Sequence, residues 1–534
     1  MGEALGCGGH LGQKDLDAIE QWLTPTWSSL PKNTAGRIER RSLRYLAYRY
    51  FNQKFALVIR GFEPSRPVNQ SGWGSEDILS QRVPAYVESV LESKHAQDNG
   101  FDLKDAVYMV ATLQELIFDS ESTLLEKVYK EQFKVSTRPL SRQGLGQILE
   151  SYLVHWMMGD DTDGIRILMH NRSLLESAFP HWNLLVEFAH GQIRAMEYKR
   201  QKVSKKSLHN HENALSSRFS FEDGHQVVGE ITRTFASFWE SECSSMKASL
   251  IKMDTHHTGR VPLSKFYSSA LDSEWRFGES ESYLRELGAL DETSSWRGKQ
   301  VIIPNYIQAA SNCIVSTSHY LVCCINDCES ILGDIEANVG GSTASPTELL
   351  SLVGNMSSIS QTTLDEDKPP ELAGSLEGQL EQIAAAHGGQ VPLHGRLFAQ
   401  WLHYAFPNEC PYPQAVASID RLTPEHWLQR PTKASKEEMK QHTRSLVVER
   451  ERDDEDISLT QWSDEELLPF HDSVQSRGFA MARSVLGGIA LVAAPVAFVL
   501  ASLRTALAGH AASGVASGRK RKSKDDGFVL PTYF

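Results

Sequence analysis

The feature that most constrains this chain is an uncharged apolar run near its C-terminus, from Ser484 to Leu503. It reads SVLGGIALVAAPVAFVLASL, with Arg483 before it and Arg504 after it. As an α-helix with a rise of about 1.5 Å per residue, the run spans roughly 30 Å, which is the thickness of a bilayer's hydrocarbon core. A buried helix of a globular core is usually shorter and has a polar side. The sequence therefore predicts one transmembrane helix within residues 479–508, which contacts the lipid bilayer through residues 484–503.

The charges that flank the predicted span indicate its orientation. Few basic residues precede it, whereas the tail behind it carries Arg519, Lys520, Arg521, Lys522 and Lys524. Positive charge favours the cytoplasmic side. We therefore expect an integral, single-pass membrane protein with a cytosolic tail and a large domain that is luminal or extracellular. The basic cluster also predicts contact with anionic lipid.

The N-terminal segment disagrees with this orientation. MGEALGCGGHLGQKDLDAIE has neither an apolar stretch nor an early basic region, so no signal peptide is visible. Two alternatives stay open. Either the start site is placed too far downstream and the signal is missing from this chain, or the protein is tail-anchored and its large domain is cytosolic.

Cysteines provide a partial test of the compartment. An even set of six lies beyond residue 240 and favours a disulfide framework, with Cys7 left over. Buried free thiols in a helical core are the alternative. A zinc site that uses His319, Cys324 and Cys328 lacks a paired CxxC motif. The six cysteines of the predicted framework are Cys243, Cys313, Cys323, Cys324, Cys328 and Cys410.

The rest of the sequence predicts a mainly α fold. Apolar residues recur at helical spacing, for example in 102–133, 145–158 and 181–199. The segment 37–51 predicts an amphipathic helix whose arginines face outward and whose inward residues are Ile38, Leu43, Leu46 and Tyr50. With 41% hydrophobic and 23% charged residues, the composition is ordinary for a globular protein. The net charge of −13 argues against nucleic acid as a partner.

Changes in composition divide the chain into regions. We expect a multi-helical N-terminal domain, an EF-hand-like pair with the cysteine cluster, a flexible loop, a third EF-hand-like segment rich in Pro and Cys, a charged stalk, the transmembrane helix and the basic tail. Their predicted bounds are 1–205, 206–340, 341–374, 375–428, 429–478, 479–508 and 509–534.

The middle region contains the one motif that resembles a ligand site. Residues 254–265 (DTHHTGRVPLSK) fit the frame of an EF-hand calcium loop, with Asp254 at position 1, Gly259 at position 6 and Val261 at position 8. The other calcium ligands are missing, because positions 3, 5 and 12 hold His256, Thr258 and Lys265. We therefore expect a structural EF-hand-like turn that binds no calcium.

The same frame recurs along the chain. GRVPLSKFYSSAL (259–271) is matched by GQVPLHGRLFAQWL (389–402) and, more loosely, by GKQVIIPNYIQAA (298–310). EF-hands pair through a short strand at loop position 8. We therefore expect the copies at Val261 and Val301 to form a degenerate pair and the third copy to pack elsewhere. Coincidence among short motifs is the alternative.

Several longer segments are distinctive. They are LPKNTAGRIERRSLRYLAYRYF (30–51), VIRGFEPSRPVN (58–69), RVPAYVESVLESKHA (82–96), SNCIVSTSHYLVCCINDCESILG (311–333) and GGQVPLHGRLFAQWLHYAFPNECPYP (388–413). Together they resemble a family of uncharacterised single-pass membrane proteins from dinoflagellate-type algae. The resemblance implies a helical, luminal or extracellular domain with an EF-hand-like middle. It implies no activity, substrate or catalytic residue.

Catalytic motifs are absent from the sequence, including GxSxG, HExxH, Walker A and the kinase loops. HNHE (209–212) lies in a predicted connector, and ECPYP (409–413) predicts a rigid corner tied by Cys410. We therefore assign no catalytic, cofactor-binding or metal-ligating residue and expect no cofactor.

The predicted function is that of a membrane-anchored binding or scaffold protein. One alternative is a membrane-bound enzyme with an unrecognised site, which a buried cluster of His, Asp or Glu in a concave pocket would favour. The other is an EF-hand-type calcium-responsive protein.

Overall fold

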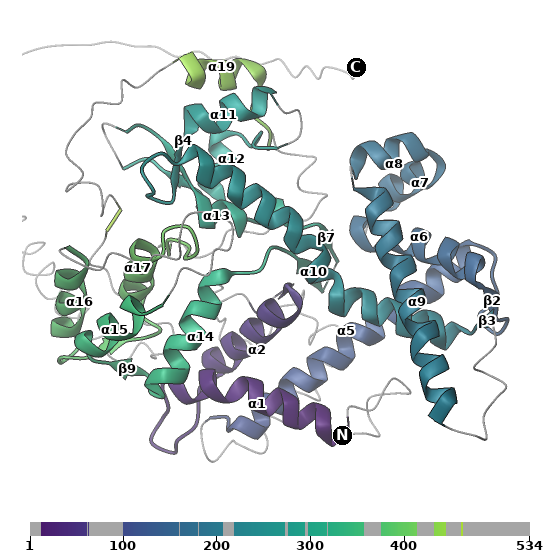
Figure 1. The fold of residues 1–534 in the computed structure, drawn as a ribbon, viewed down its shortest axis with the longest axis horizontal. Coiled ribbons are helices and arrows are strands. Elements are labelled where there is room, and N and C mark those ends of the chain that lie inside the picture. The colour runs from purple at the N-terminus through teal and green to yellow at the C-terminus, as the bar shows by residue number, and fades with distance from the viewer. Residues whose placement is uncertain are drawn as a thin grey trace, which may run out of the picture. The chain divides into compact units, whose positions relative to one another are not determined.

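The computed structural model describes most of the chain up to residue 462. The described residues are 12–60, 62, 100–159, 161–179, 181–206, 218–272, 276–293, 297–317, 319–356, 375–413, 432–444 and 461–462. They belong to one compact unit, Met1–Phe470. They form a mainly helical structure with a few short strands, which confirms the predicted fold class at this level (Figure 1).

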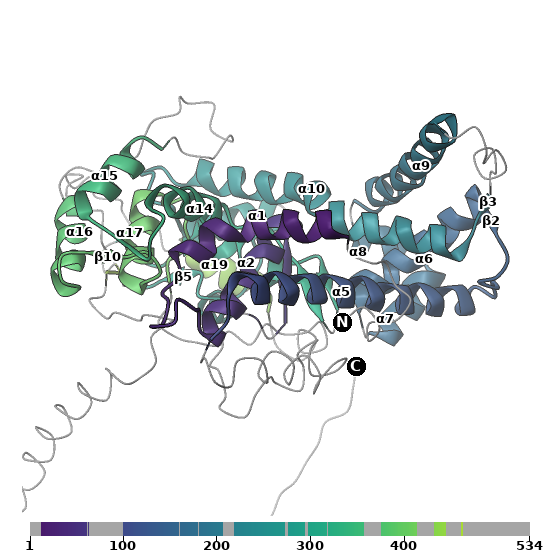
Figure 2. The ribbon, with the colours of Figure 1, turned by 90° about the horizontal axis from the view of Figure 1, so that it is seen from below.

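The N-terminal part consists of helices around one apolar core. Helix α1 packs against α5 and α14 (Figure 2). The start of α5 is fixed by a capping box. The Asp102 side chain accepts the backbone N–H of Asp105, and the Asp105 side chain accepts the backbone N–H of Asp102. These helices are α1 (Gln13–Ser29), α2 (Arg40–Phe55), α5 (Leu103–Glu131), α6 (Arg142–Met158), α7 (Thr162–His170), α8 (Arg172–Ala178) and α9 (Trp182–Lys206).

Three pairs of short antiparallel strands recur along the chain, and each strand comes directly before a helix. We call the resulting modules pairs one, two and three. Pair one joins β2 (Leu140–Ser141) to β3 (Arg218–Phe219), ahead of α6 and α10 (Phe221–Met253). Pair two joins β4 (Arg260–Pro262) to β6 (Gln300–Ile302), ahead of α11 (Leu263–Asp272) and α13 (Ile303–Ile307). Pair three joins β9 (Thr343–Ala344) to β10 (Val391–Pro392), ahead of α15 (Pro346–Gly354) and α17 (Arg396–Ala405).

The register of these strands bears on the repeat found in the sequence. Val261 lies opposite Val301, so the strands of these two copies pair as predicted. The third copy packs elsewhere, because Val391 lies opposite Ala344. In pair one, Leu140 lies opposite Phe219.

The remaining elements complete three apolar clusters. The first contains the N-terminal helices and the first half of α10, the second contains pair two, and the third contains pair three. The remaining elements are β1 (Leu57–Ile59), α12 (Glu281–Glu286), β5 (Leu290–Asp291), η1 (Ala310–Asn312), β7 (Val315–Ser316), β8 (Tyr320–Val322), α14 (Asp327–Val339), α16 (Ser375–Ala386) and α19 (Lys436–Arg444).

Six cysteines form three disulfides, which confirms the predicted framework. The bonds are Cys243–Cys324, Cys313–Cys323 and Cys328–Cys410. Cys324 and Cys328, which the alternative zinc site would use, are both disulfide-bonded, so neither is a free thiolate ligand. Cys7 lies outside the described residues.

The predicted localisation needs a correction. Among the residues described here, no helix is long and apolar enough to cross a membrane. The longest, α10, has acidic residues in its first turn and buries one side in the core. This finding overturns the prediction of an integral, single-pass membrane protein. The predicted span (484–503) and the basic tail (509–534) lie outside the described residues.

Two predicted regions also differ from the structure where they are described. Within the predicted loop 341–374, residues 343–354 form β9 and α15, because β9 finds a partner in β10. Within the predicted stalk 429–478, residues 436–444 form α19, which packs on α11 and buries Met439.

Candidate functional site

The loop 254–265, predicted to be EF-hand-like, is closed by its own hydrogen bonds. The carboxylate of Asp254 is 4% exposed and accepts the backbone N–H groups of Gly259 at 2.7 Å and His256 at 3.2 Å. At the other end of the loop, Lys265 donates from Nζ to Oγ1 of Thr255 at 3.2 Å. A calcium ion at this position would meet the ammonium group of Lys265 where a calcium loop needs a bidentate carboxylate.

Gly259 holds this loop against another part of the chain. Its φ of 69° lies in the left-handed region, and a Cβ atom here would lie 2.0 Å from the carbonyl oxygen of Pro407. Both the backbone conformation and the close approach therefore require glycine. Position 6 of the loop is therefore packed against the backbone of Pro407, and the loop forms a junction with that part of the chain.

The corner ECPYP (409–413) forms the other side of this junction. Cys410 is tied to Cys328, as the prediction of a rigid corner requires. Asn305, in pair two, donates to the carbonyl oxygen of Tyr412 at 2.9 Å and accepts the Tyr412 N–H at 2.7 Å. The corner thus fastens the chain that follows pair three to pair two.

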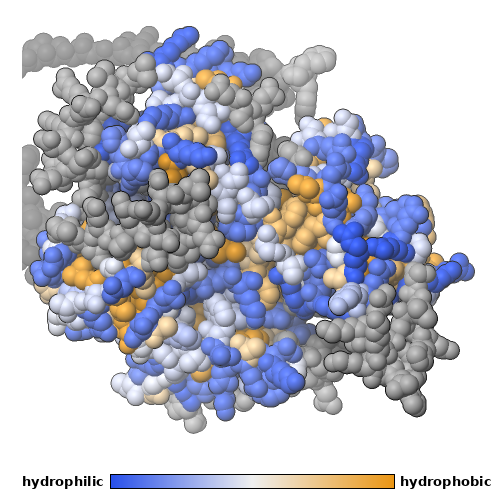
Figure 3. Space-filling model, viewed as in Figure 1, coloured by the Kyte–Doolittle hydropathy of each residue, from blue (hydrophilic) through white to orange (hydrophobic). Residues whose placement is uncertain are grey.

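A concave pocket of about 300 Å³ lies where the N-terminal helices meet α10 and the segment 306–314. Its walls are mainly aromatic and sulfur-containing side chains. Figure 3 shows hydrophobic side chains gathered on this face, between α10 and the α8–α9 region. The apolar wall includes Met157, Phe179, Trp182, Phe238, Trp239 and Met246.

The titratable groups of the pocket are engaged with one another. Glu242 forms an ion pair with Arg276 and lies 3.3 Å from Nε2 of His181. Both carboxyl oxygens of Glu279 lie 3.1 Å from the hydroxyl of Tyr306, which donates to them. Burial raises the pKa of Glu279 above its usual value.

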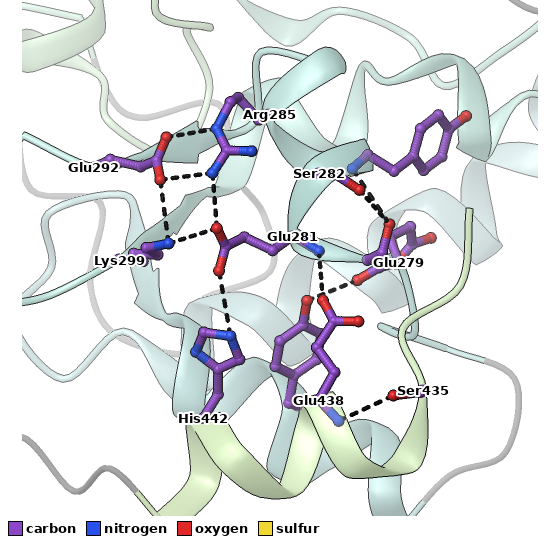
Figure 4. A network of polar contacts seen from close by, with 12 residues as sticks. Glu279, Glu281, Ser282, Arg285, Glu292, Lys299, Ser435, Glu438 and His442 are labelled. Carbon is purple, nitrogen blue, oxygen red and sulfur yellow. Dashed lines mark hydrogen bonds and ion pairs between the residues drawn. The ribbon is translucent and has the colours of Figure 1, made fainter. Parts of the chain in front are cut away.

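A polar network beside pair two fixes helix α19 (Figure 4). Glu281, in the first turn of α12, accepts Arg285 at 2.7 Å and lies 3.3 Å from Nε2 of His442. Glu438 accepts the backbone N–H of Glu281 at 3.1 Å. Although burial acts to raise it, hydrogen bonds from Lys299 and Arg285 lower the pKa of Glu281.

Backbone bonds strengthen this attachment. The N–H of Ser280 donates to the carbonyl of Thr432, and the N–H of Ala434 donates to the carbonyl of Gly278, both at 2.8 Å. The segment 432–444 is therefore held as a short bridge followed by a helix. The apolar anchor of that helix is Met439, which is 8% exposed.

A second buried acid belongs to the N-terminal core. Glu121 is 2% exposed and accepts the hydroxyl of Tyr320 at 2.9 Å, and Trp156 donates its indole N–H to the same hydroxyl at 2.7 Å. Burial raises the pKa of Glu121 to about 8. Because protein side chains enclose the group, we assign it a structural role.

The sequence did not reveal the pocket, since its wall comes from separate segments with no common motif. Large aromatic residues in α9 and α10 were the available signal, but core helices carry the same residues. HNHE (209–212) lies outside the described residues. In the described part of the chain, no cluster of three or more His, Cys, Asp or Glu side chains could hold a metal ion.

Comparisons with known proteins do not identify a relative. No family model matches the chain, and neither the curated proteins nor the solved structures provide a match. The resemblance to the dinoflagellate-type family stays a prediction.

Proposed function

We propose that this protein is a non-catalytic binding or scaffold protein whose three strand pairs are degenerate EF-hand-like modules that bind no calcium. The observation that carries this proposal is the loop 254–265. It keeps the frame of a calcium loop, but position 3 is His256, and Lys265 at position 12 donates to Thr255 within the loop. A module of this kind serves as a rigid support and not as a calcium sensor.

The register of the strands supports the same frame in all three pairs. If each central strand residue is loop position 8, then position 12, where calcium needs a bidentate Glu, is occupied by Gly144, Asp223, Lys265, Asn305, Glu348 and Gly395. Asp223 and Glu348 are the two acids of this set. Asp223 accepts the backbone N–H of Ser220 at 2.6 Å and pairs with Arg200. Position 1 of the Glu348 loop is Ala337, whose side chain has no oxygen ligand.

Calcium titration of the full chain tests this proposal. We expect no saturable heat in calorimetry and no rise in melting temperature at millimolar calcium. A variant with His256→Asp, Thr258→Asp and Lys265→Glu restores oxygen ligands at positions 3, 5 and 12, so we expect it to bind calcium measurably. Tight calcium binding by the unaltered chain would contradict the proposal that these modules bind no calcium. Failure of the folded triple variant to bind would contradict the EF-hand-like frame.

An enzyme is the second candidate, favoured by the acids and His181 in the pocket. Against it, Glu242 and Glu279 are both engaged in pairs with neighbouring side chains. An enzymatic activity that the Glu279→Gln variant loses and the matched Glu281→Gln variant keeps would favour the enzyme as the function of this protein. A turnover equally affected by both would not.

The three disulfides support folding in an oxidising compartment. Alkylation of thiols in intact cells, before any reduction, tests this. We expect the six paired cysteines to escape alkylation, and labelling of all six would contradict the proposal.

A further inference from the structure

The loop 132–139, between α5 and β2, contains a residue that does not suit its place in the fold. Phe133 follows the end of α5 with a φ of 53°, in the left-handed region. Its N–H donates to the carbonyl of Lys130 at 3.1 Å, and the N–H of Lys134 donates to the carbonyl of Tyr129 at 2.9 Å. These two bonds form a Schellman motif, whose left-handed position is usually glycine because a side chain is strained there.

The side chain of Phe133 gains no packing in return for this strain. It is 95% exposed, and Val135, two residues further on, is 56% exposed. The base of the loop is fixed to α6, because Nε2 of Gln132 donates to Oγ of Ser151 at 3.1 Å. Single exposed apolar residues are ordinary, but Phe133 combines full exposure with an unfavourable backbone. This combination indicates a contact with something outside the chain.

The charge around Phe133 indicates the chemistry of that partner. Lys134 and Arg138 are exposed and form no ion pair within the described part of the chain. The loop 132–139 contains no acidic residue, although the whole chain has a net charge of −13. Lys130, one turn before the loop, is 72% exposed. Apolar side chains among exposed basic ones match the surface of an anionic lipid bilayer.

A lipid surface fits this loop better than a protein partner does. A specific protein interface buries about 800 Å² on each partner, which requires a broad complementary surface. Phe133 and Val135 on one short loop offer much less. A bilayer interface needs no complementary shape, because it takes up apolar side chains and attracts basic residues by charge.

We propose that the loop 132–139 attaches the protein reversibly to the surface of a bilayer that contains anionic lipid. Phe133 and Val135 enter the interfacial layer, and Lys134 and Arg138 lie against the negatively charged head groups. This contact is peripheral and needs no spanning helix. It does not depend on the calcium loop, so it stands or fails separately from the proposed function.

A fluorescent probe in the loop tests this proposal. Because the basic tail 509–534 was also predicted to contact anionic lipid, the readout has to lie in the loop itself. In the full chain with Cys7→Ser, the variant Val135→Cys is labelled with an environment-sensitive NBD group. Vesicles of equal parts phosphatidylserine and phosphatidylcholine should brighten and blue-shift its emission, and vesicles of phosphatidylcholine alone should leave it nearly unchanged. No response to the anionic vesicles, or an equal response to both, would overturn the proposal.

Phe133→Gly separates lipid contact from a structural role. Glycine relieves the strained backbone, so the melting temperature should rise. The affinity of the labelled chain for the anionic vesicles should nevertheless fall about tenfold, because the burial of one Phe side chain is lost. Ile167→Ala, at an exposed apolar position on α7, is the matched control and should leave the affinity unchanged. If the labelled Phe133→Gly chain binds the anionic vesicles as tightly as the chain with Phe133, the proposed contact is wrong.

Discussion

Arg49 shows, at the scale of a residue, what a helical pattern cannot predict. Its neighbours Leu43, Leu46 and Tyr50 are buried as predicted, but Arg49 was predicted to face outward and is 1% exposed. It forms ion pairs with Glu336 at 2.5 Å and Glu329 at 3.0 Å, both on α14. The partners lie almost three hundred residues away, so nothing in the local pattern indicates that this arginine is inside. A buried charge needs such partners.

Glu121 gives a prediction at the same scale. Its pKa is about 8 in the folded chain, against an ordinary value of 4.5. The folded state therefore retains a proton that the unfolded state loses, and stability should fall as the pH rises from about 4.5 to about 8, by about 1.4 kcal/mol per pH unit from this group. Urea unfolding across this range measures the slope.

Glu121→Gln is neutral at every pH and should flatten this slope. Glu126→Gln, an exposed position on the same helix, is the control and should leave it unchanged. An unaltered slope in Glu121→Gln would mean that another group binds the proton.

At the scale of elements, the sequence predicted helices well and strand partners only in part. Segments 102–133, 145–158 and 181–199 correspond to α5, α6 and α9, because amphipathic periodicity is a local signal. The Val261–Val301 pair was predicted because both strands share the apolar motif after a glycine. The partner of Val391 was missed because β9 is a Thr-Ala dipeptide, which has little strand character of its own.

Helix α19 carries a prediction at this scale. Nine residues form no stable helix alone, so α19 depends on Met439 and the network around Glu281. Met439→Asp places a charge in the apolar contact with α11 and should release the segment. Trypsin should then cleave at Lys440 or Arg444 faster than in the unaltered chain.

Glu437→Ala is the matched control, since Glu437 is exposed on the same helix. Its cleavage rate should equal that of the unaltered chain. If Met439→Asp is cleaved no faster than this control, the packing of α19 does not depend on Met439.

At the scale of the whole described unit, each disulfide belongs to a different apolar cluster: Cys313–Cys323 to the first, Cys243–Cys324 to the second and Cys328–Cys410 to the third. Cys243–Cys324 and Cys328–Cys410 close sequence separations of 81 and 82 residues, whereas Cys313–Cys323 closes one of 10. The number of paired cysteines followed from the sequence. Their connectivity did not, because six cysteines allow 15 arrangements.

The chain-entropy model predicts that these disulfides contribute unequally to the free energy of unfolding. Removing the bond at Cys328 and Cys410 by a double Ser substitution should cost about 4–5 kcal/mol, and removing the bond at Cys313 and Cys323 about 3 kcal/mol. Denaturant unfolding of the two double variants measures the difference. A larger loss for the short bond would show that native contacts, and not loop closure, dominate.

Helix α10 belongs to two cores at once, since Val227 and Phe235 lie in the first apolar cluster and Met246 and Leu250 in the second. A helix propagates order along its length, so disorder in one cluster reaches the other through a single continuous backbone. Heating should therefore melt both clusters in one transition. A break of the chain within α10 would leave two fragments, each with an incomplete apolar core, so neither half should fold without the other.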